Sequence, residues 1–242
     1  MSPPIEERGG EGEAYAFGIE GLDEMLGGGL RRGHVAVVTG SPMSGRELFG
    51  DHFFIEGLGK GDVGIYLTTR LFHTEIRTAM EERGWTLEPH RERFTFIDAY
   101  SPQSDPSLQD TGDTRYVASV ADFAKLSNTM VSIMGQYHAV GRNRQRLVVD
   151  TLDTLLMYVS APGVYRFLSY LRAKVKAGGA AAVLSLQPEL HEEKDVRTIT
   201  QLADLLIELD HETAKIRVSR PGKPRRDGTY GISDSGMMVR PG

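Results

Sequence analysis

The sequence predicts an α/β fold in which a mainly parallel, twisted sheet is flanked by helices. Short β-branched runs alternate along the chain with longer segments whose apolar residues recur every three or four positions. This alternation is typical of strands joined by crossover helices, which make the strands parallel. A chain of 242 residues with 40% hydrophobic residues also suits one domain with a large core.

The first elements follow from composition and glycine placement. We expect residues 1–13 to form a disordered tail and residues 14–242 to form a single domain, because the Pro-, Gly- and Glu-rich start has almost no apolar surface to offset the entropy lost on ordering. A short amphipathic helix at 21–26 ends at the three glycines of 27–29. The β-branched run at 34–40 then reads as a buried strand.

The rest of the domain repeats the strand–helix unit. Each expected strand is short and β-branched, and each expected helix carries an apolar stripe. In chain order we expect a helix at 47–59, a strand at 64–69, a helix at 74–84, a strand at 93–100, a helix over 123–137, a strand at 146–150, a helix at 163–179, and strands at 181–187 and 202–210. Residues 101–113 should form an exposed loop, and residues 214–242 a hairpin with a basic turn.

Composition narrows the classes of function. The net charge of −5 and the charged fraction of 25% describe an ordinary solvated surface, not the basic face of a dedicated DNA-binding protein. The absence of cysteine excludes disulfides and thiolate chemistry. No apolar run is long enough to cross a membrane, and the first residues lack the pattern of a signal peptide. We therefore expect a cytoplasmic protein without a membrane partner.

A glycine-rich segment after the first buried strand has the spacing of a phosphate-binding loop. Its two glycines lie five positions apart, as in G-x-x-x-x-G-K-[ST], but 28 glycines in the chain make spacing alone a weak signal. The context strengthens it, because a strand before the loop and a helix after it would aim backbone N–H groups at an anion. The predicted loop consists of Gly40, Ser41, Pro42, Met43, Ser44, Gly45, Arg46 and Glu47.

The segment FGIEGLDEMLGGGLRRGHVAVVTGSPMSG, residues 17–45, resembles the opening of the KaiC/RadA group of RecA-like ATPases. That group begins with a G-x-x-x-L-D-x-x-L-G-G-G-I-x-x-G block, and weaker agreement extends to about residue 222. The resemblance implies a RecA-like P-loop NTPase fold with ATP and Mg²⁺ as cofactors. Two substitutions in the loop put both cofactors in doubt for this chain.

Arg46 stands where the group has its working lysine, and Glu47 where it has a magnesium-binding Ser or Thr. Arginine is a planar fork that needs room, so we expect Arg46 to attract phosphate only from outside the cradle. A Glu47 carboxylate ~4 Å from a phosphate would repel it by about 4 kcal/mol at an effective dielectric near 20, and it favours the helix N-terminus itself. The loop is therefore predicted to be degenerate and partly self-filled. Two alternatives stay open: Glu47 is simply a first-turn acid with Arg46 as its partner, or its carboxylate coordinates Mg²⁺ directly.

The remaining family positions are also altered or ambiguous. By the resemblance, the Glu pair that activates water corresponds to Arg70 and Leu71, neither of which can accept a proton at neutral pH. Asp150 corresponds to the Walker B aspartate that orients the magnesium shell, although a strand-end Asp can simply cap a turn. Gln187 corresponds to a sensor of the γ-phosphate, with an ordinary polar loop residue as the equal alternative.

Near the end of the chain, Arg220 matches an arginine that KaiC-type rings present to the neighbouring subunit's nucleotide, which makes it a candidate subunit-interface residue. The accompanying lysine position is Val218. The basic residues just beyond, Lys223, Arg225 and Arg226, are more typical of a solvated turn than of a phosphate site.

These substitutions favour a degenerate, non-hydrolysing RecA/KaiC-like protein without catalytic residues. Its expected role is a regulatory or signalling module that binds other proteins, among them active RecA/KaiC-like relatives or itself. The alternative is an ATP-binding KaiC-like ATPase with a variant loop. A RadA-like accessory protein of DNA recombination ranks third, because the expected loops 160–165 and 188–198 are not basic. No metal site is predicted, since the seven histidines lack zinc-ligand spacing.

Overall fold

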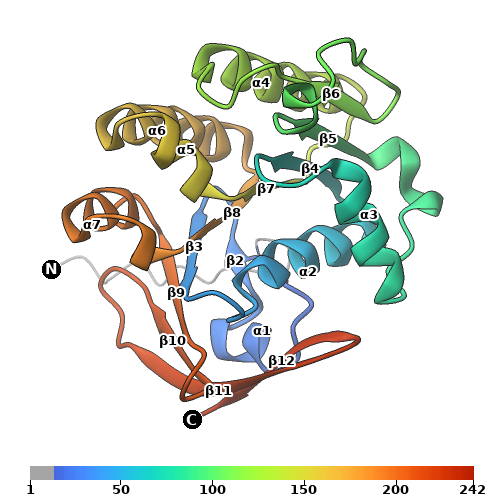
Figure 1. Ribbon diagram of the computed structural model, residues 1–242. Helices are drawn as coiled ribbons and strands as arrows, with labels where there is room; N and C mark the ends of the chain where they lie inside the picture. Colours follow the sequence, from blue (N-terminus) through green and yellow to red (C-terminus); the bar gives the residue numbers. More distant parts are fainter. Residues whose placement is uncertain (1–13) are drawn as a thin grey trace, which may run out of the picture.

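The computed structural model describes residues 14–242, so the tail expected at 1–13 lies outside the described residues. A ten-stranded sheet runs through the domain in the order β12-β11-β10-β9-β3-β8-β7-β4-β5-β6 (Figure 1). The parallel strands are β3 (Val35–Gly40), β4 (Val63–Thr68), β5 (Phe94–Asp98), β6 (Thr114–Tyr116), β7 (Gln145–Asp150), β8 (Ala181–Leu186) and β9 (Leu205–Asp210). The mainly parallel α/β sheet that the sequence predicts is therefore confirmed.

Three antiparallel strands extend one edge of this sheet: β10 (Lys215–Ser219), β11 (Arg226–Ser233) and β12 (Gly236–Pro241). A separate two-stranded sheet pairs β1 (Ala14–Tyr15) with β2 (Leu30–Arg31). The expectation of a simple hairpin at 214–242 was wrong by one strand. The third strand was not predicted because only a short polar run, 233–236, separates β11 from β12 in the sequence.

Helices cover both faces of the sheet (Figure 1). One face carries α1 (Leu22–Leu26), α2 (Arg46–Gly59) and α3 (His73–Glu82). The other face carries α4 (Phe123–Ala139), α5 (Leu152–Tyr158), α6 (Ala161–Gly178) and α7 (Glu193–Thr200). Short 3₁₀ helices lie at η1 (Glu88–Arg93), η2 (Ser101–Gln103) and η3 (Pro188–Leu190). The sheet thus separates two apolar cores.

The central strands are apolar throughout because alternate residues face opposite sides of the sheet and helices cover both sides. In β3, Ala36 and Val38 belong to the core under α2, whereas Val35 and Val37 belong to the core under α6. A strand covered on both faces has no solvent side on which polar residues would be favoured. The same reasoning explains the stripe on α4, where Leu126, Met130 and Ile133 are buried as expected.

Several local expectations were wrong. The segments 160–165 and 188–198, expected as loops, hold the start of α6 and, in the second case, η3 with much of α7. Within 101–113, the 3₁₀ helix η2 begins with buried Ser101 and Pro102, so only the later part is an exposed loop. Short or polar helices escape sequence analysis because they have too few apolar positions to show a period. No helix within residues 14–242 combines the length and apolarity needed to cross a bilayer.

Candidate functional site

The predicted phosphate loop connects β3 to α2 at the carboxyl edge of the sheet, where ligands of open α/β sheets bind. Gly45 directly precedes α2 with φ of +77°, a left-handed conformation that favours glycine. Met43 also has a positive φ, 64°, and its side chain is 80% exposed at the tip of the loop. Ser44 is buried, and its hydroxyl has no partner among the described residues. The backbone thus retains the strand–loop–helix geometry of an anion site.

Arg46 lies inside this loop, and the expectation that it would stay outside the cradle was wrong. Its side chain is buried, and Nη1 donates long hydrogen bonds to the carbonyl oxygens of Gly40 (3.4 Å) and Ser41 (3.3 Å). Nη2 lies 3.1 Å from Oε1 of Glu47 and 3.5 Å from Oδ2 of Asp153. An arginine fits here because the loop's own carbonyls and two carboxylates supply acceptors for its fork.

Asp150 ends β7 and forms an ion pair with Arg70, whose Nε lies 3.1 Å from Oδ1. Burial raises the pKa of Asp150 above its usual value, and the charge of Arg70 opposes that rise. The second oxygen, Oδ2, has no partner within residues 14–242. Leu71, beside Arg70, packs against the core under α2. At this edge, a cation therefore stands where the resemblance places a water-activating carboxylate.

Asp153 joins three segments that sequence analysis did not connect. Oδ1 accepts hydrogen bonds from the backbone N–H of Gln187 (2.8 Å) and lies 3.0 Å from Nε2 of His191, while Oδ2 accepts from the Thr151 hydroxyl (2.7 Å). The only local signal was a second carboxylate three positions after the strand-end Asp150. Since Asp153 also faces Arg46, it links the loop after β3 to the segments after β7 and β8.

A second missed carboxyl, Asp51, lies one turn beyond Glu47 on α2 and accepts a 2.8 Å hydrogen bond from the hydroxyl of Tyr66. Burial, reinforced by the negative charge of Asp150, raises the pKa of Asp51 to about 7. Nothing in the sequence signals this pKa shift, because Tyr66 and Asp150 lie on the strands β4 and β7 and come near Asp51 only in the folded chain. The site therefore holds a carboxyl that titrates near neutral pH.

This shift predicts a pH-dependent effect of Asp51→Asn on stability. The folded chain keeps the Asp51 proton up to about pH 7, whereas the unfolded chain loses it near pH 3.8. Folding therefore binds a proton between these values, and wild-type stability falls as the pH rises through them, by about 1.4 kcal/mol per pH unit. The Asn side chain can still accept from Tyr66 but does not titrate. The free energy of unfolding of the variant, relative to that of the wild type, should therefore rise from about pH 4 to pH 7. Above pH 7 this difference should stay constant.

Urea unfolding of both proteins at several pH values between 4.5 and 8 measures this difference. Asp234→Asn, at an exposed aspartate between β11 and β12, is the matched control. A stability difference for Asp51→Asn that varies with pH no more than that of the control would contradict the prediction.

The structure brings together most of the predicted site residues. The loop 40–47, Asp150 and Gln187 all lie in or after the adjacent strands β3, β7 and β8, at one edge of the sheet. Arg220 does not join them. It follows β10, which runs antiparallel to β9, so it lies at the opposite edge, where its Nη2 donates a 2.8 Å hydrogen bond to the carbonyl of Leu26. Its role at a subunit interface stays a prediction.

The charges at the site are matched internally. Arg46 contacts Glu47 and Asp153, and Arg70 contacts Asp150. Within residues 14–242, no group of three or more His, Asp or Glu side chains has the arrangement of a metal site. Cations thus hold Glu47, Asp150 and Asp153, whereas Asp51 is held by the hydroxyl of Tyr66.

Comparisons with known proteins identify relatives of this chain. A family model described as "ATPase: KaiC" matches residues 15–222. The UPF0273 protein PH0284 of Pyrococcus horikoshii is 26% identical over 239 residues, covering 93% of this chain and 92% of that protein. The UPF0273 protein MK0039 of Methanopyrus kandleri is 24% identical over 242 residues, covering 95% and 92%. The crystal structure of the KaiC-like protein PH0186 from Pyrococcus horikoshii superimposes with a TM-score of 0.66 at 17% identity, covering 95% of this chain and 99% of that one.

Proposed function

Because this chain belongs to the KaiC family of ATPases, we propose that it is a degenerate, non-hydrolysing member that acts as a regulatory or signalling module by binding other proteins. The observation that carries the proposal is the ion pair between Arg70 and Asp150. General base catalysis requires a group that can accept a proton from water within hydrogen-bond reach. A guanidinium stays protonated at all physiological pH values, so Arg70 cannot perform that step.

The loop supports the same conclusion for nucleotide binding. A phosphate group in the cradle would have to displace the Arg46 guanidinium from the carbonyls of Gly40 and Ser41. It would also meet the charge of Glu47 in the first turn of α2, where the helix N-terminus would otherwise attract an anion. The residues present therefore do not fit magnesium-bound ATP in this arrangement.

Exposed apolar side chains support a protein-binding role. Three segments that follow the adjacent strands β3, β8 and β7 carry exposed large apolar residues, namely Met43 (80% exposed), Leu190 (55%), and Met157 with Tyr158 (74% and 62%). Large apolar side chains that are this exposed favour contact with another protein over contact with water. The partners that we propose are active KaiC-like relatives or a second copy of this chain.

A second candidate function is an ATP-binding KaiC-like ATPase with a variant loop. The intact loop backbone favours it, since Gly40 ends β3, Gly45 directly precedes α2, and backbone N–H groups remain at the start of the helix. Calorimetric titration with ATP and Mg²⁺ separates the two functions. Binding of micromolar affinity by the unmodified chain would favour the second candidate, and absence of binding heat at millimolar nucleotide favours the first.

We expect no steady-state ATP hydrolysis above background, because the positions that would activate water hold Arg70 and Leu71. The measurement is release of phosphate from ATP with Mg²⁺ over hours, with Asp150→Ala as the control for contaminating ATPases. Turnover near an ordinary ~1 per second that Asp150→Ala abolishes would overturn the non-hydrolysing function.

A further inference from the structure

A polar cavity of about 400 Å³ lies at the β6 end of the sheet. Its walls come from the loop 108–110, from β6 and from the first half of α4, and α4 lies beside β6 in Figure 1. Cavities that bind small molecules have volumes of roughly 300–1,000 Å³, so this one has the size of a ligand site. Strands β8, β7, β4 and β5 lie between β6 and β3, which leads to the phosphate loop. A ligand here would therefore be separate from that loop.

The lining of the cavity is almost entirely polar. Apart from Leu108, the described residues that line it are Gln109, Asp110, Arg115, Tyr116, Lys125 and Thr129. A polar group that loses water without gaining a hydrogen bond destabilises the complex. The ligand must therefore offer hydrogen-bonding groups over most of its surface.

The charged residues of the lining leave one positive charge in excess. Oδ2 of Asp110 lies 3.8 Å from Nε of Arg115, so these two charges largely offset each other. Lys125 lines the cavity from α4 and forms no ion pair within residues 14–242. A ligand with one negative charge matches Lys125, whereas a second negative charge would be repelled by Asp110.

The charged pair opposite Lys125 is fixed before any ligand binds. Nη1 of Arg115 donates hydrogen bonds to the carbonyl oxygens of Thr111 and Thr114. Oδ1 of Asp110 accepts a 2.9 Å hydrogen bond from the backbone N–H of Tyr116. Side chains that are already held lose little conformational freedom when a ligand binds, which favours affinity.

Neutral hydrogen-bonding groups complete the cavity. The ring of Tyr116 lies 5.8 Å from the ring of His73, whose Nδ1 is in turn 2.8 Å from the buried carboxylate of Asp98. The hydroxyl groups of Tyr116 and Thr129 and the Oε1 atom of Gln109 have no hydrogen-bond partner within the part of the chain that the structure describes. Hydroxyls can both donate and accept, and an amide oxygen accepts. These groups suit a ligand that carries several hydroxyls.

We propose that this cavity binds a monocarboxylate with several hydroxyl groups, of the sugar-acid class. The carboxylate would pair with Lys125, and the ligand hydroxyls would bond to Gln109, Tyr116 and Thr129. One carboxylate supplies the single negative charge that the lining calls for. The hydroxyls satisfy polar groups that an apolar acid would leave without partners.

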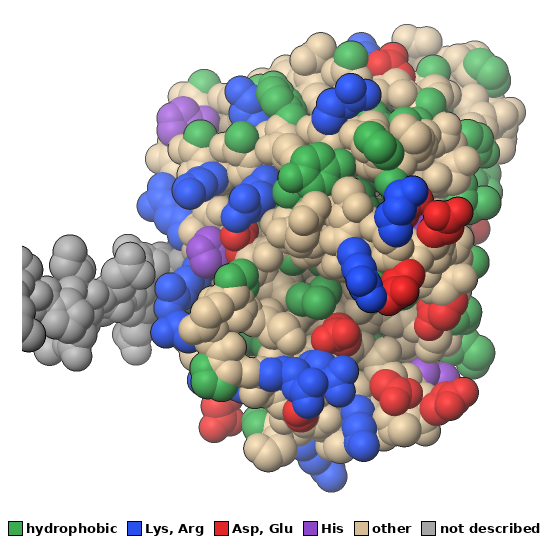
Figure 2. Space-filling view, turned by 90° about the vertical axis from the view of Figure 1, so that its left-hand side faces the viewer, with side chains coloured by type: hydrophobic (Ala, Val, Ile, Leu, Met, Phe, Trp, Pro, Cys, Tyr) green, Lys and Arg blue, Asp and Glu red, His purple; other side chains and the backbone are tan. Residues whose placement is uncertain are grey.

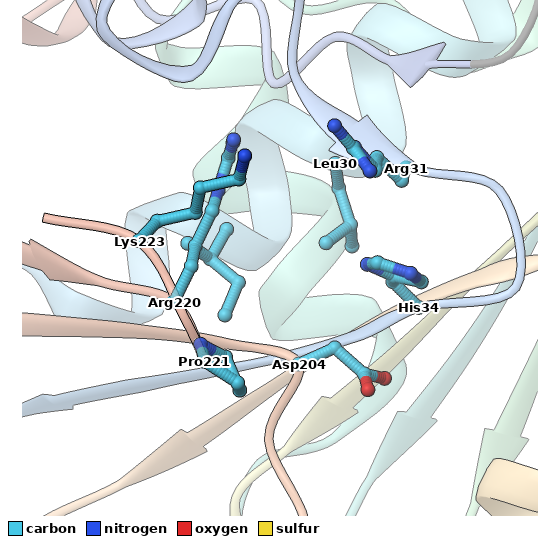
Figure 3. Close-up of a pocket in the computed structure, with 8 residues that line it drawn as sticks. Leu30, Arg31, His34, Asp204, Arg220, Pro221 and Lys223 are labelled. Atoms are coloured by element: carbon cyan, nitrogen blue, oxygen red, sulfur yellow. The ribbon is translucent and has the colours of Figure 1, made fainter. Parts of the chain in front are cut away.

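Cations elsewhere on the surface also attract anions, without a specific site. Figure 2 shows Lys and Arg side chains gathered along one side of the face that it views. A second pocket, of about 170 Å³, lies where β3 and β9 begin, with Arg220 and Lys223 on one side and His34 on the other (Figure 3). Since β9 and β6 are at opposite ends of the parallel part of the sheet, His34 reports such general attraction independently of the cavity.

Lys125 and Lys194 provide a matched pair of variants. Each is an exposed lysine in the first turn of a helix, α4 or α7, and both helices cover the same face of the sheet. Neither forms an ion pair within residues 14–242, and Lys125 lines the cavity whereas Lys194 does not. Lys125→Gln and Lys194→Gln therefore remove the same charge, but only the first removes it from the cavity.

The experiment is a titration of the full chain with sodium gluconate, followed by amide NMR. The signals of Gln109 and Thr129 should shift and saturate, and those of His34 and Gly45 should not follow the same curve. Glucose has the hydroxyls without the charge, and hexanoate has the charge without the hydroxyls, so each should bind at least about tenfold more weakly. Lys125→Gln should weaken gluconate binding about tenfold, the effect of one lost charged contact. Lys194→Gln should bind within about twofold of the wild type, because an exposed charge away from the cavity contributes little.

Three results would overturn the proposal. The first is the absence of saturation at Gln109 and Thr129 with gluconate. The second is equal binding of gluconate and either glucose or hexanoate, which would mean that the cavity does not recognise the carboxylate or does not recognise the hydroxyls. The third is equal weakening by Lys125→Gln and Lys194→Gln, or a shift of His34 along the same curve, which would mean a general charge effect. None of these outcomes depends on nucleotide binding or on a protein partner, so this proposal and the proposed function fail independently.

Discussion

Replacing Arg46 with Lys and Glu47 with Thr should create or strengthen binding of magnesium-bound ATP. Lysine would withdraw the guanidinium from the carbonyls of Gly40 and Ser41 and leave a compact cation in its place. Threonine would remove a negative charge whose repulsion of a phosphate ~4 Å away is about 4 kcal/mol at an effective dielectric near 20, and it would provide a hydroxyl for Mg²⁺.

The gain is measured by calorimetry and by thermal unfolding. Nucleotide at a hundredfold excess over its Kd stabilises the folded chain by roughly 2.7 kcal/mol, which corresponds to a rise in Tm of about 5–10 °C for a domain of this size. ATP hydrolysis should remain absent, because Arg70 still pairs with Asp150. Restoring Glu at positions 70 and 71 is a separate test of catalysis.

A control with the same two substitutions is available on α7, where Arg197 and Glu193 form an exposed ion pair. Arg197→Lys with Glu193→Thr should leave nucleotide binding unchanged. The prediction fails if the unmodified chain already binds ATP with micromolar affinity and the Arg46→Lys, Glu47→Thr variant binds no better. Arg46 and Glu47 would then form a working variant of the loop, as the second candidate function requires.

Removing Asp62 should cause a large loss of stability. Its Oδ2 accepts a 2.8 Å hydrogen bond from Nε of Arg146, which is fully buried, and its Oδ1 accepts a 2.9 Å bond from Arg144. The Arg146 guanidinium also lies 4.6 Å from the ring centre of Phe53, deep in the core under α2. Asp62→Ala would leave this guanidinium buried without its counter-charge, at a cost of about 3–5 kcal/mol in the free energy of unfolding.

Urea unfolding measures this loss against a surface control. Asp227→Ala removes an aspartate that pairs with Arg217 at an exposed site, and such pairs contribute about 0–1 kcal/mol. If Asp62→Ala does not fold, the double variant Asp62→Leu with Arg146→Met tests the same reasoning, because replacing both partners removes the unpaired charge and should recover much of the stability. Equal losses for Asp62→Ala and Asp227→Ala would show that the buried pair is not important for stability.

The sequence by itself determined the central architecture and the place of the phosphate loop. The β-branched run of β3, the glycines at 40 and 45 and the apolar positions of α2 are consecutive in the chain, so each reports on its neighbours. The apolar stripe of α4 was recognisable for the same reason. Elements of few residues, such as β6 with three and α5 with seven, carried too short a pattern to be found. The polar helix α7 escaped because its sequence offers few apolar positions.

Only the tertiary structure decided what the site residues do. Arg70 and Asp150 are 80 positions apart, and they meet because β4 and β7 are neighbours in the sheet. Arg46 turns inward because Asp153, 107 positions away, adds an acceptor that the loop alone lacks. The turn after β10 reads as uniformly basic in sequence, yet folding directs Lys223 to a pocket and Arg225 to Asp227. A charge takes its role from the partners that folding brings within a few ångströms, because electrostatic energy depends on distance in space and not on separation along the chain.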